Sequence, residues 1–424
     1  MASTSFYLWR NNMPSVAEVA NTYHSLARKD IKLTELMPFQ KWLPTKILGV
    51  RVHWNAIWHH RLAIEIACQF KEDGDCGTYI NELNKYYKEY KKLYSTMPLC
   101  SNKSISHYIG QCALDCLLCK PNEKHIATLA EIFNRVVKDG AFTEGGHYSK
   151  YVTDCFDRVE NLFEGWYGRH SNGVLQQSYK DIIISLNKVK RWQRLISDTN
   201  GTMAVIGDGW HEKVTPIEED GDFYYSDMTI HRKDGWLVIK NHRQNKFSLH
   251  QQAHCDEILI AHEGDWLIKG AGMPSYKEVM SHPFKWRRPR NHFFSETNWD
   301  IWILWRHRIP ELTWKNEVAL DRLVKIDGNT LTIVERPEKR TLRFPGDRNT
   351  LSETFTLRDK ASSDERQKIK WTYSKFTFVV EGVNIELLKD DVVCAATTYG
   401  NEKTIPVLRV KGEDIITRIT AHDK

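Results

Sequence analysis

The stretch IIISLNKVKRWQRLISDTNG, residues 182–201, marks the point where the sequence pattern changes from helical to β. Up to Ile196 its apolar residues recur every three or four positions, which is typical of an amphipathic helix. The turn residues Thr199–Asn200–Gly201 end this pattern. From Asp222 onward, short runs of β-forming residues alternate with turns. The sequence therefore predicts a helical half followed by a β half.

Upstream of this point, further segments show the same helical periodicity. Short breaks containing Gly, Pro, Asn or Asp separate them, and repeated helix–turn–helix units favour antiparallel helix pairs. The predicted helices are Ile57–Phe70, Ser104–Leu118, Lys124–Val137, Val152–Phe163 and Ile182–Ile196.

Downstream, seven segments have the composition of strands, and four dipeptides that end in glycine are typical of hairpin turns. The predicted strands are Trp236–Lys240, Glu257–Ala261, Asp265–Ile268, Leu320–Ile326, Thr330–Val334, Phe376–Val380 and Val392–Thr397. The predicted turns are Asp234–Gly235, Glu263–Gly264, Asp327–Gly328 and Glu381–Gly382.

The composition excludes several classes of protein. With 41% hydrophobic and 27% charged residues, the chain is an ordinary globular protein and not a disordered or collagen-like one. No window approaches 18 uninterrupted apolar residues, so we expect no membrane-spanning helix. The net charge of +6 over 424 residues permits an anionic partner without requiring one. The 15 tryptophans weakly favour carbohydrate, because indole faces stack on sugar rings.

The cysteines and the first residues bear on the compartment. Nine cysteines without framework spacing favour a reducing compartment, and Met1–Asn12 shows no secretory signal. These features indicate the cytoplasm, or the periplasm or exterior if the sequence is that of a trimmed mature form. Cys112, Cys116 and Cys119 share one helical face, which we interpret as a buried stripe and not as a metal site.

Three stretches combine histidine, tyrosine and small residues. The first begins a predicted helix, the second is a glycine turn that opens another, and the third leads into a predicted strand. They are Ser104-Ile-Ser-His107-Tyr-Ile-Gly-Gln111, Glu144-Gly-Gly-His147-Tyr148-Ser-Lys150-Tyr151 and Leu249-His250-Gln-Gln-Ala-His254-Cys-Asp256.

Together with three further motifs, these stretches resemble the heparinase II/III superfamily of polysaccharide lyases. The resemblance runs from about Ser104 to His292, and its motifs occur in the same order as in the family. The matching positions are Ser106–His107, Gly145–Tyr148, Asn200–Gly201 with Gly207–Asp208, Gln252–Asp256, Leu267–Tyr276 and Asn291–His292. It implies an N-terminal (α/α) toroid-like helical domain over 1–205 and an antiparallel β-sandwich domain over 206–424.

The implied reaction is the cleavage of a uronate-containing anionic polysaccharide by β-elimination, which makes the protein a carbon–oxygen lyase. The uronate C5 proton is removed and the glycosidic oxygen at C4 is expelled. The C5 proton is only weakly acidic while the neighbouring carboxylate is charged. The site therefore needs donors that neutralise the carboxylate and stabilise the developing enolate, such as His, Asn, Gln or Arg. Tyrosine or histidine can act as the base and as the acid.

The resemblance assigns these roles to particular residues. We expect His107, with Gln252 or His250, to neutralise the carboxylate. The position of the family's catalytic tyrosine is Asp154, and Tyr151 lies about one helical turn earlier, so Tyr151 or Tyr148 is predicted to be the base and acid. The residues expected to bind the polymer are Arg287, Arg288, Arg290 and His147.

A metal site is weakly indicated. The resemblance places metal ligands at His254 and His292, but Gly270 occupies the position of the third ligand, an aspartate. Two imidazoles without a carboxylate make a poor Zn²⁺ site, so we expect no required cofactor.

Two alternatives remain open from the sequence. Replacements at Ser106, Asp154, Gln252 and Gly270 favour a catalytically degenerate protein that binds glycan, for example in capsule or exopolysaccharide metabolism. Nucleic-acid binding through the basic segment at Arg287 is disfavoured, because no aromatic–basic recognition motif accompanies it.

Overall fold

The computed structural model describes the chain in segments, and the statements below concern only these. They are residues 102–117, 120–169, 173–206, 212–226, 228–241, 258–268, 293–294, 321–336, 340–345, 355–358, 366–395 and 402–422. Of these, 102–144 and Tyr148–Lys190 belong to one compact unit, and Gly145–His147 with the residues from Arg191 onward belong to a second. The domain division predicted from the sequence stays a prediction.

The described helices come first in the chain, as predicted. They are α6 (Asn102–Leu117), α7 (Glu123–Val136), α8 (Gly146–Asp157), α9 (Glu160–Phe163), a π-helical turn (Glu164–Gly168) and α10 (Gly173–Leu195). A two-stranded hairpin of β1 (Val137–Lys138) and β2 (Ala141–Phe142) follows α7. The predicted helix Ile57–Phe70 lies outside the described residues.

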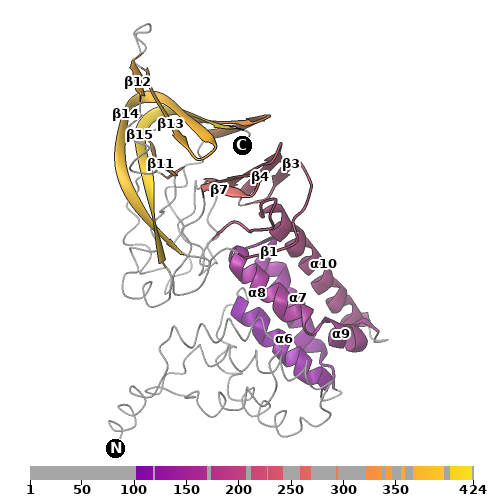
Figure 1. Ribbon diagram of the computed structural model, residues 1–424. Helices are drawn as coiled ribbons and strands as arrows, with labels where there is room; N and C mark the ends of the chain where they lie inside the picture. Colours follow the sequence, from indigo (N-terminus) through magenta and orange to yellow (C-terminus); the bar gives the residue numbers. More distant parts are fainter. Residues whose placement is uncertain are drawn as a thin grey trace, which may run out of the picture. The chain divides into compact units, whose positions relative to one another are not determined.

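Helices α6 and α7 lie side by side (Figure 1), and each buries the apolar residues of one face. Ile105, Ile109, Cys112 and Cys116 of α6 are at most 1% exposed, at the spacing of one helix face. Burial raises the pKa of the Cys112 thiol well above its usual value, so this thiol stays protonated. The interpretation of Cys112 and Cys116 as a buried stripe is therefore confirmed, whereas Cys119 lies outside the described residues.

Two helix predictions need a correction. The helix predicted as Ile182–Ile196 begins nine residues earlier, at Gly173. The segment predicted as Val152–Phe163 is two helices, since α8 ends at Asp157 and α9 begins at Glu160. Helix α8 also begins six residues earlier than predicted, at Gly146. The alternation of apolar residues is continuous through both helices, so periodicity alone does not reveal the break.

The later part of the chain forms two antiparallel sheets. One has the order β3-β4-β5-β6-β7; the other has the order β12-β13-β14-β15-β10-β9, with β11 paired to β15 and β8. The strands of the first sheet are β3 (Gly221–Tyr224), β4 (Met228–Lys233), β5 (Trp236–Asn241), β6 (Ile258–His262) and β7 (Asp265–Ile268). Those of the second are β8 (Phe293–Phe294), β9 (Asp321–Asp327), β10 (Thr330–Arg336), β11 (Arg340–Pro345), β12 (Phe355–Arg358), β13 (Arg366–Tyr373), β14 (Phe376–Ala395) and β15 (Glu402–Ala421).

Two of the predicted hairpin turns are confirmed residue for residue. Asp234–Gly235 joins β4 to β5 and Glu263–Gly264 joins β6 to β7, and all four residues have positive φ. This is the backbone that a two-residue hairpin loop with right-handed strand twist requires. The turn predicted at Asp327–Gly328 lies one residue later, because Asp327 still pairs with Thr330.

The hairpin turn predicted at Glu381–Gly382 is wrong. Both residues lie inside the 20-residue strand β14, which Figure 1 shows curving alongside β15. The register shifts between Glu381 and Val383, so the glycine marks a β-bulge. A Cβ at Gly382 would lie 2.8 Å from the Glu413 carbonyl oxygen, which explains why glycine stands there. The strand predicted at Phe376–Val380 and the described residues of the one predicted at Val392–Thr397, up to Ala395, are thus parts of one strand.

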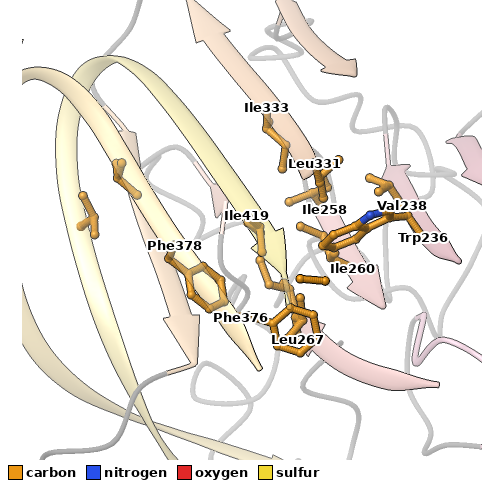
Figure 2. Packing of buried hydrophobic residues seen from close by; sticks show 14 of the residues in the cluster. Trp236, Val238, Ile258, Ile260, Leu267, Leu331, Ile333, Phe376, Phe378 and Ile419 are labelled. Carbon is orange, nitrogen blue, oxygen red and sulfur yellow. The ribbon is translucent and has the colours of Figure 1, made fainter. Parts of the chain in front are cut away.

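The two sheets share one apolar core (Figure 2). Trp236, Val238, Ile258 and Ile260 of the five-stranded sheet face side chains of the eight-stranded sheet such as Phe376, and each is at most 2% exposed. The Trp236 indole N–H donates to the Gly328 carbonyl oxygen at 3.1 Å. Each such large apolar side chain stabilises the fold by roughly 1.5–3 kcal/mol. The predicted antiparallel β architecture is confirmed within the described residues. Among the same residues, no helix is long and apolar enough to span a membrane.

One polar side chain interrupts this core. Thr417 of β15 is 1% exposed, between Ile333 and Val380 on the neighbouring strands, and its hydroxyl has no hydrogen-bond partner among the described residues. We expect Thr417→Val to raise the free energy of unfolding by about 1 kcal/mol, because it removes an unsatisfied buried hydroxyl at nearly constant volume. Denaturant unfolding checks this, with Thr372→Val at an exposed position of β13 as the matched control. A lower unfolding midpoint for Thr417→Val would contradict the expectation.

Candidate active site

The Gly145–Gly146 pair determines where helix α8 begins. Gly145 has φ of +91°, in the left-handed region that favours glycine. A Cβ on Gly146 would lie 3.0 Å from Met203 Cε and 3.2 Å from the Ala204 carbonyl oxygen, so the helix start packs closely on this segment. The first turn of α8 therefore presents His147 at a defined place.

His147 forms a buried pair with Glu212. The two side chains are 7% and 8% exposed, and His147 Nδ1 lies 2.8 Å from Glu212 Oε1. A carboxylate beside Nδ1 holds the imidazole with Nδ1 protonated. Glu212 is positioned in turn by its backbone carbonyl, which accepts from the Met203 N–H at 2.8 Å. The predicted polymer contact at His147 is thus a side chain whose Nδ1 is already engaged.

The structure brings Tyr151 of α8 to Ser106 of α6. Their hydroxyl oxygens are 2.9 Å apart, and Ser106 Oγ also lies 2.9 Å from the Asn102 carbonyl oxygen. Glu144, 1% exposed, accepts from the Asn102 N–H and so caps the start of α6 with a negative charge. Ser106 therefore lies near the start of α6, which is held by the Glu144 cap and by the Ser106–Asn102 hydrogen bond, and it anchors the Tyr151 hydroxyl.

His107, the residue that follows Ser106 in the sequence, is buried. It is 5% exposed, and its ring meets the Tyr108 ring edge-on at 5.1 Å between centroids. Burial, followed by the charge of His125, lowers the pKa of His107 to about 3. At neutral pH it is an uncharged imidazole that can donate a hydrogen bond but adds no positive charge.

The tyrosines and Asp154 differ in how they are held. Tyr148 is 8% exposed and buried, whereas Tyr151 is partly exposed. Asp154, which the sequence resemblance aligns with a catalytic tyrosine, is paired with Lys150 one turn before it on the same helix. Of the two predicted bases, only Tyr151 combines an anchored hydroxyl with partial exposure.

The remaining predicted site residues lie outside the described residues. The predicted meeting of these side chains with the helical ones stays a prediction, as does the weak zinc site. The predicted site residues outside the described segments are His250, Gln252, His254, Arg287, Arg288, Arg290 and His292, together with Gly270. Within the described segments, no group of three or more His, Cys, Asp or Glu side chains is placed to hold a metal.

Glu212 and the Ser106–Tyr151 hydrogen bond are the parts of the site that sequence analysis missed. Glu212 is 65 residues from His147, and Ser106 is 45 residues from Tyr151. No spacing rule links residues this far apart, and the motif match identifies Ser106 only as a departure from asparagine.

Comparison with known proteins shows the fold. No model of a protein family matches the chain, and no curated protein matches it. Among solved structures, heparan sulfate lyase HepC from Pedobacter heparinus is 11% identical with a TM-score of 0.54, over 92% of this chain and 72% of that one. The heparinase III BT4657 gene product is 12% identical with a TM-score of 0.56, over 95% and 74%. The chain thus has the fold of polysaccharide lyases.

The depressed pKa of His107 gives a test of its burial. Between pH 6.5 and 5.5 the unfolded chain takes up a proton at His107 and the folded chain does not, so stability falls as the pH falls. For an ordinary histidine pKa in the unfolded chain this amounts to about 1 kcal/mol. We expect His107→Gln to lose about 1 kcal/mol less than the unchanged protein over this interval, measured by denaturant unfolding at both pH values. Equal losses would mean that the folded protein protonates His107.

Proposed function

We propose that the protein is a polysaccharide lyase that cleaves a uronate-containing anionic polysaccharide, such as a glycosaminoglycan, by β-elimination. The fold shared with two lyases supports the reaction class. The observation that carries the proposal is the hydroxyl pair of Ser106 and Tyr151, 2.9 Å apart on helices α6 and α8. It anchors a partly exposed phenol beside the helix that carries His107.

Tyr151 supplies both proton transfers in this proposal. Its phenolate takes the C5 proton of the uronate, the electron pair forms the C4–C5 double bond, and the bond from C4 to the glycosidic oxygen breaks. The Tyr151 hydroxyl then protonates the departing oxygen, which regenerates the phenolate. One side chain therefore acts as base and acid, and no cofactor is required.

Ser106 is suited to hold Tyr151 in both protonation states. Ser106 Oγ lies 2.9 Å from two acceptors, the Asn102 carbonyl oxygen and the Tyr151 oxygen, and its single proton can be directed to either one. While Tyr151 is protonated, Ser106 can donate to Asn102 and accept from the phenol. When Tyr151 is a phenolate, rotation of the Ser106 hydroxyl directs its proton to the anion. This donation stabilises the base form without moving either helix.

In this proposal the resemblance gives His107 the role of binding the uronate carboxylate as the enolate develops. A neutral imidazole N–H gains strength as a donor when negative charge builds up on the acceptor, and the buried surroundings increase this effect. Positive charge must then come from other residues, for which we propose Arg287, Arg288 and Arg290. His250 or Gln252 completes the carboxylate site, on a β-sandwich that follows an (α/α) toroid.

A second candidate function is glycan binding without catalysis. The observation that favours it is the ion pair of Asp154 with Lys150, at the position where the family has its tyrosine. An aspartate in that pair cannot replace a phenol as the acid that protonates the leaving oxygen, so activity depends on Tyr151.

The lyase proposal is tested by the unsaturated uronate product, which absorbs in the near ultraviolet. The protein is incubated with heparan sulfate, chondroitin sulfate, hyaluronan and alginate, and the absorbance is followed with time. We expect Tyr151→Phe to lower the rate at least about 100-fold, because general acid–base catalysis is lost. Ser106→Ala should lower it about tenfold, the effect of one hydrogen bond to a charged group.

Two further variants make this test specific. Tyr179→Phe, a buried tyrosine of α10, serves as the matched control and should keep its rate. If Tyr148→Phe abolishes activity and Tyr151→Phe does not, the base assignment is wrong. Binding of polymer without any rise in absorbance would support the second candidate function.

A further inference from the structure

The eight-stranded sheet has a second face, which points away from the apolar core. Along β13, β14, β15, β10 and β9, buried side chains that belong to the core alternate with partly or fully exposed ones. Alternation places every second residue on the outer face. We call the exposed set on these five strands the outer face.

The strand register arranges this outer face in rows that cross the strands. The first row contains four threonines on adjacent strands, Thr372, Thr377, Thr420 and Thr330. The second row, two residues further along each strand, contains Lys370, Val379, Arg418, Thr332 and Lys325. The outer face therefore carries a row of hydroxyls beside a row in which every second strand contributes a cation.

The spacing of these cations follows from sheet geometry. Neighbouring strands lie about 4.8 Å apart, so Lys370, Arg418 and Lys325 follow one another at roughly 10 Å. The threonine row lies about 7 Å away, the rise of two residues. Repeated charges at this spacing, next to hydroxyl groups, match a polymer whose sugar rings carry one acidic group every second residue.

The two lysine charges of this row are available to a ligand, and the Arg418 charge is shared with a carboxylate. Lys370 and Lys325 are exposed, and Lys325 has only a loose contact of 4.0 Å with Asp327. Lys370 has no ion pair within the segments that the structure describes. Arg418 is held by Glu381 at 2.8 Å and is 42% exposed, so it presents an ordered guanidinium in the middle of the row.

We propose that this outer face is a glycan-binding surface, on which one chain of the anionic polysaccharide lies along the cationic row. It contains none of the side chains proposed for catalysis and would hold the polymer between cleavage events. The choice of ligand rests on the proposed function. Carboxylate or sulfate groups would pair with the three cations, and sugar hydroxyls would bond to the threonines.

The composition of the two rows favours glycan over nucleic acid. Single-stranded nucleic acids are bound on platforms where bases stack on aromatic side chains. Neither row contains an aromatic residue. Hydroxyl and cationic side chains on a rigid sheet match sugar hydroxyls and acidic groups instead.

Binding and cleavage are measured separately to test this inference. The double variant Lys325→Gln, Lys370→Gln removes two exposed charges, and Lys180→Gln, Lys188→Gln removes two exposed charges from helix α10 as the matched control. The probes are size-fractionated heparan sulfate and hyaluronan. We expect the outer-face variant to bind long chains about tenfold more weakly with a shallower salt dependence, and the control to bind like the unchanged protein. Cleavage of short oligosaccharides should be equal in all three.

The outcomes separate this inference from the lyase proposal. If the unchanged protein cleaves and binds polymer while the outer-face variant behaves like the control, the outer face is not the binding surface and the lyase proposal stands. If the outer-face variant loses binding in a protein that shows no cleavage, the surface is supported and the lyase proposal fails. Absence of polymer binding, or tighter binding of double-stranded DNA than of glycan at equal ionic strength, overturns the inference.

Discussion

Close packing of Gly146 against the Met203–Ala204 segment fixes the start of helix α8, and the proposed chemistry depends on that start. A side chain at Gly146 would collide with this segment, and Gly145 needs a positive φ to lead into it. Once the helix begins there, its regular rise places Tyr151 in its second turn, where its hydroxyl meets Ser106. Tyr151 thus follows Gly146 by five residues in the same helix.

Two of the predicted site histidines are buried, and each is held in its own way. His107 stays uncharged because burial and a neighbouring imidazole lower its pKa, and the carboxylate of Glu212 engages Nδ1 of His147. A neutral imidazole donor can stabilise charge that develops during a reaction without first forming a strong ion pair with the substrate. Exposed positive charges are found on the outer face of the eight-stranded sheet, for example at Lys370.

The β part shows how one alternating pattern serves two purposes. The inward residues of β13, β14 and β15 form the apolar core with the smaller sheet, and the outward ones form rows of hydroxyls and cations. A bulge at Gly382 lets β14 continue for 20 residues alongside β15. Because the core packs against the inner face of these strands, the rows of threonines and cations on the outer face keep a fixed spacing.

The sequence by itself determined the local features of this protein. Helices α6 and α7, the hairpins at Gly235 and Gly264, and the change from helix to strand near Gly201 follow from spacing and turn chemistry, which act between neighbours in the chain. Glycine at position 382 was ambiguous, since the same residue suits a hairpin turn and a bulge. Only the tertiary structure shows that Gly382 forms a bulge, that His147 pairs with Glu212 and that Ser106 anchors Tyr151. These contacts join residues far apart in the chain, and packing of whole elements brings them together.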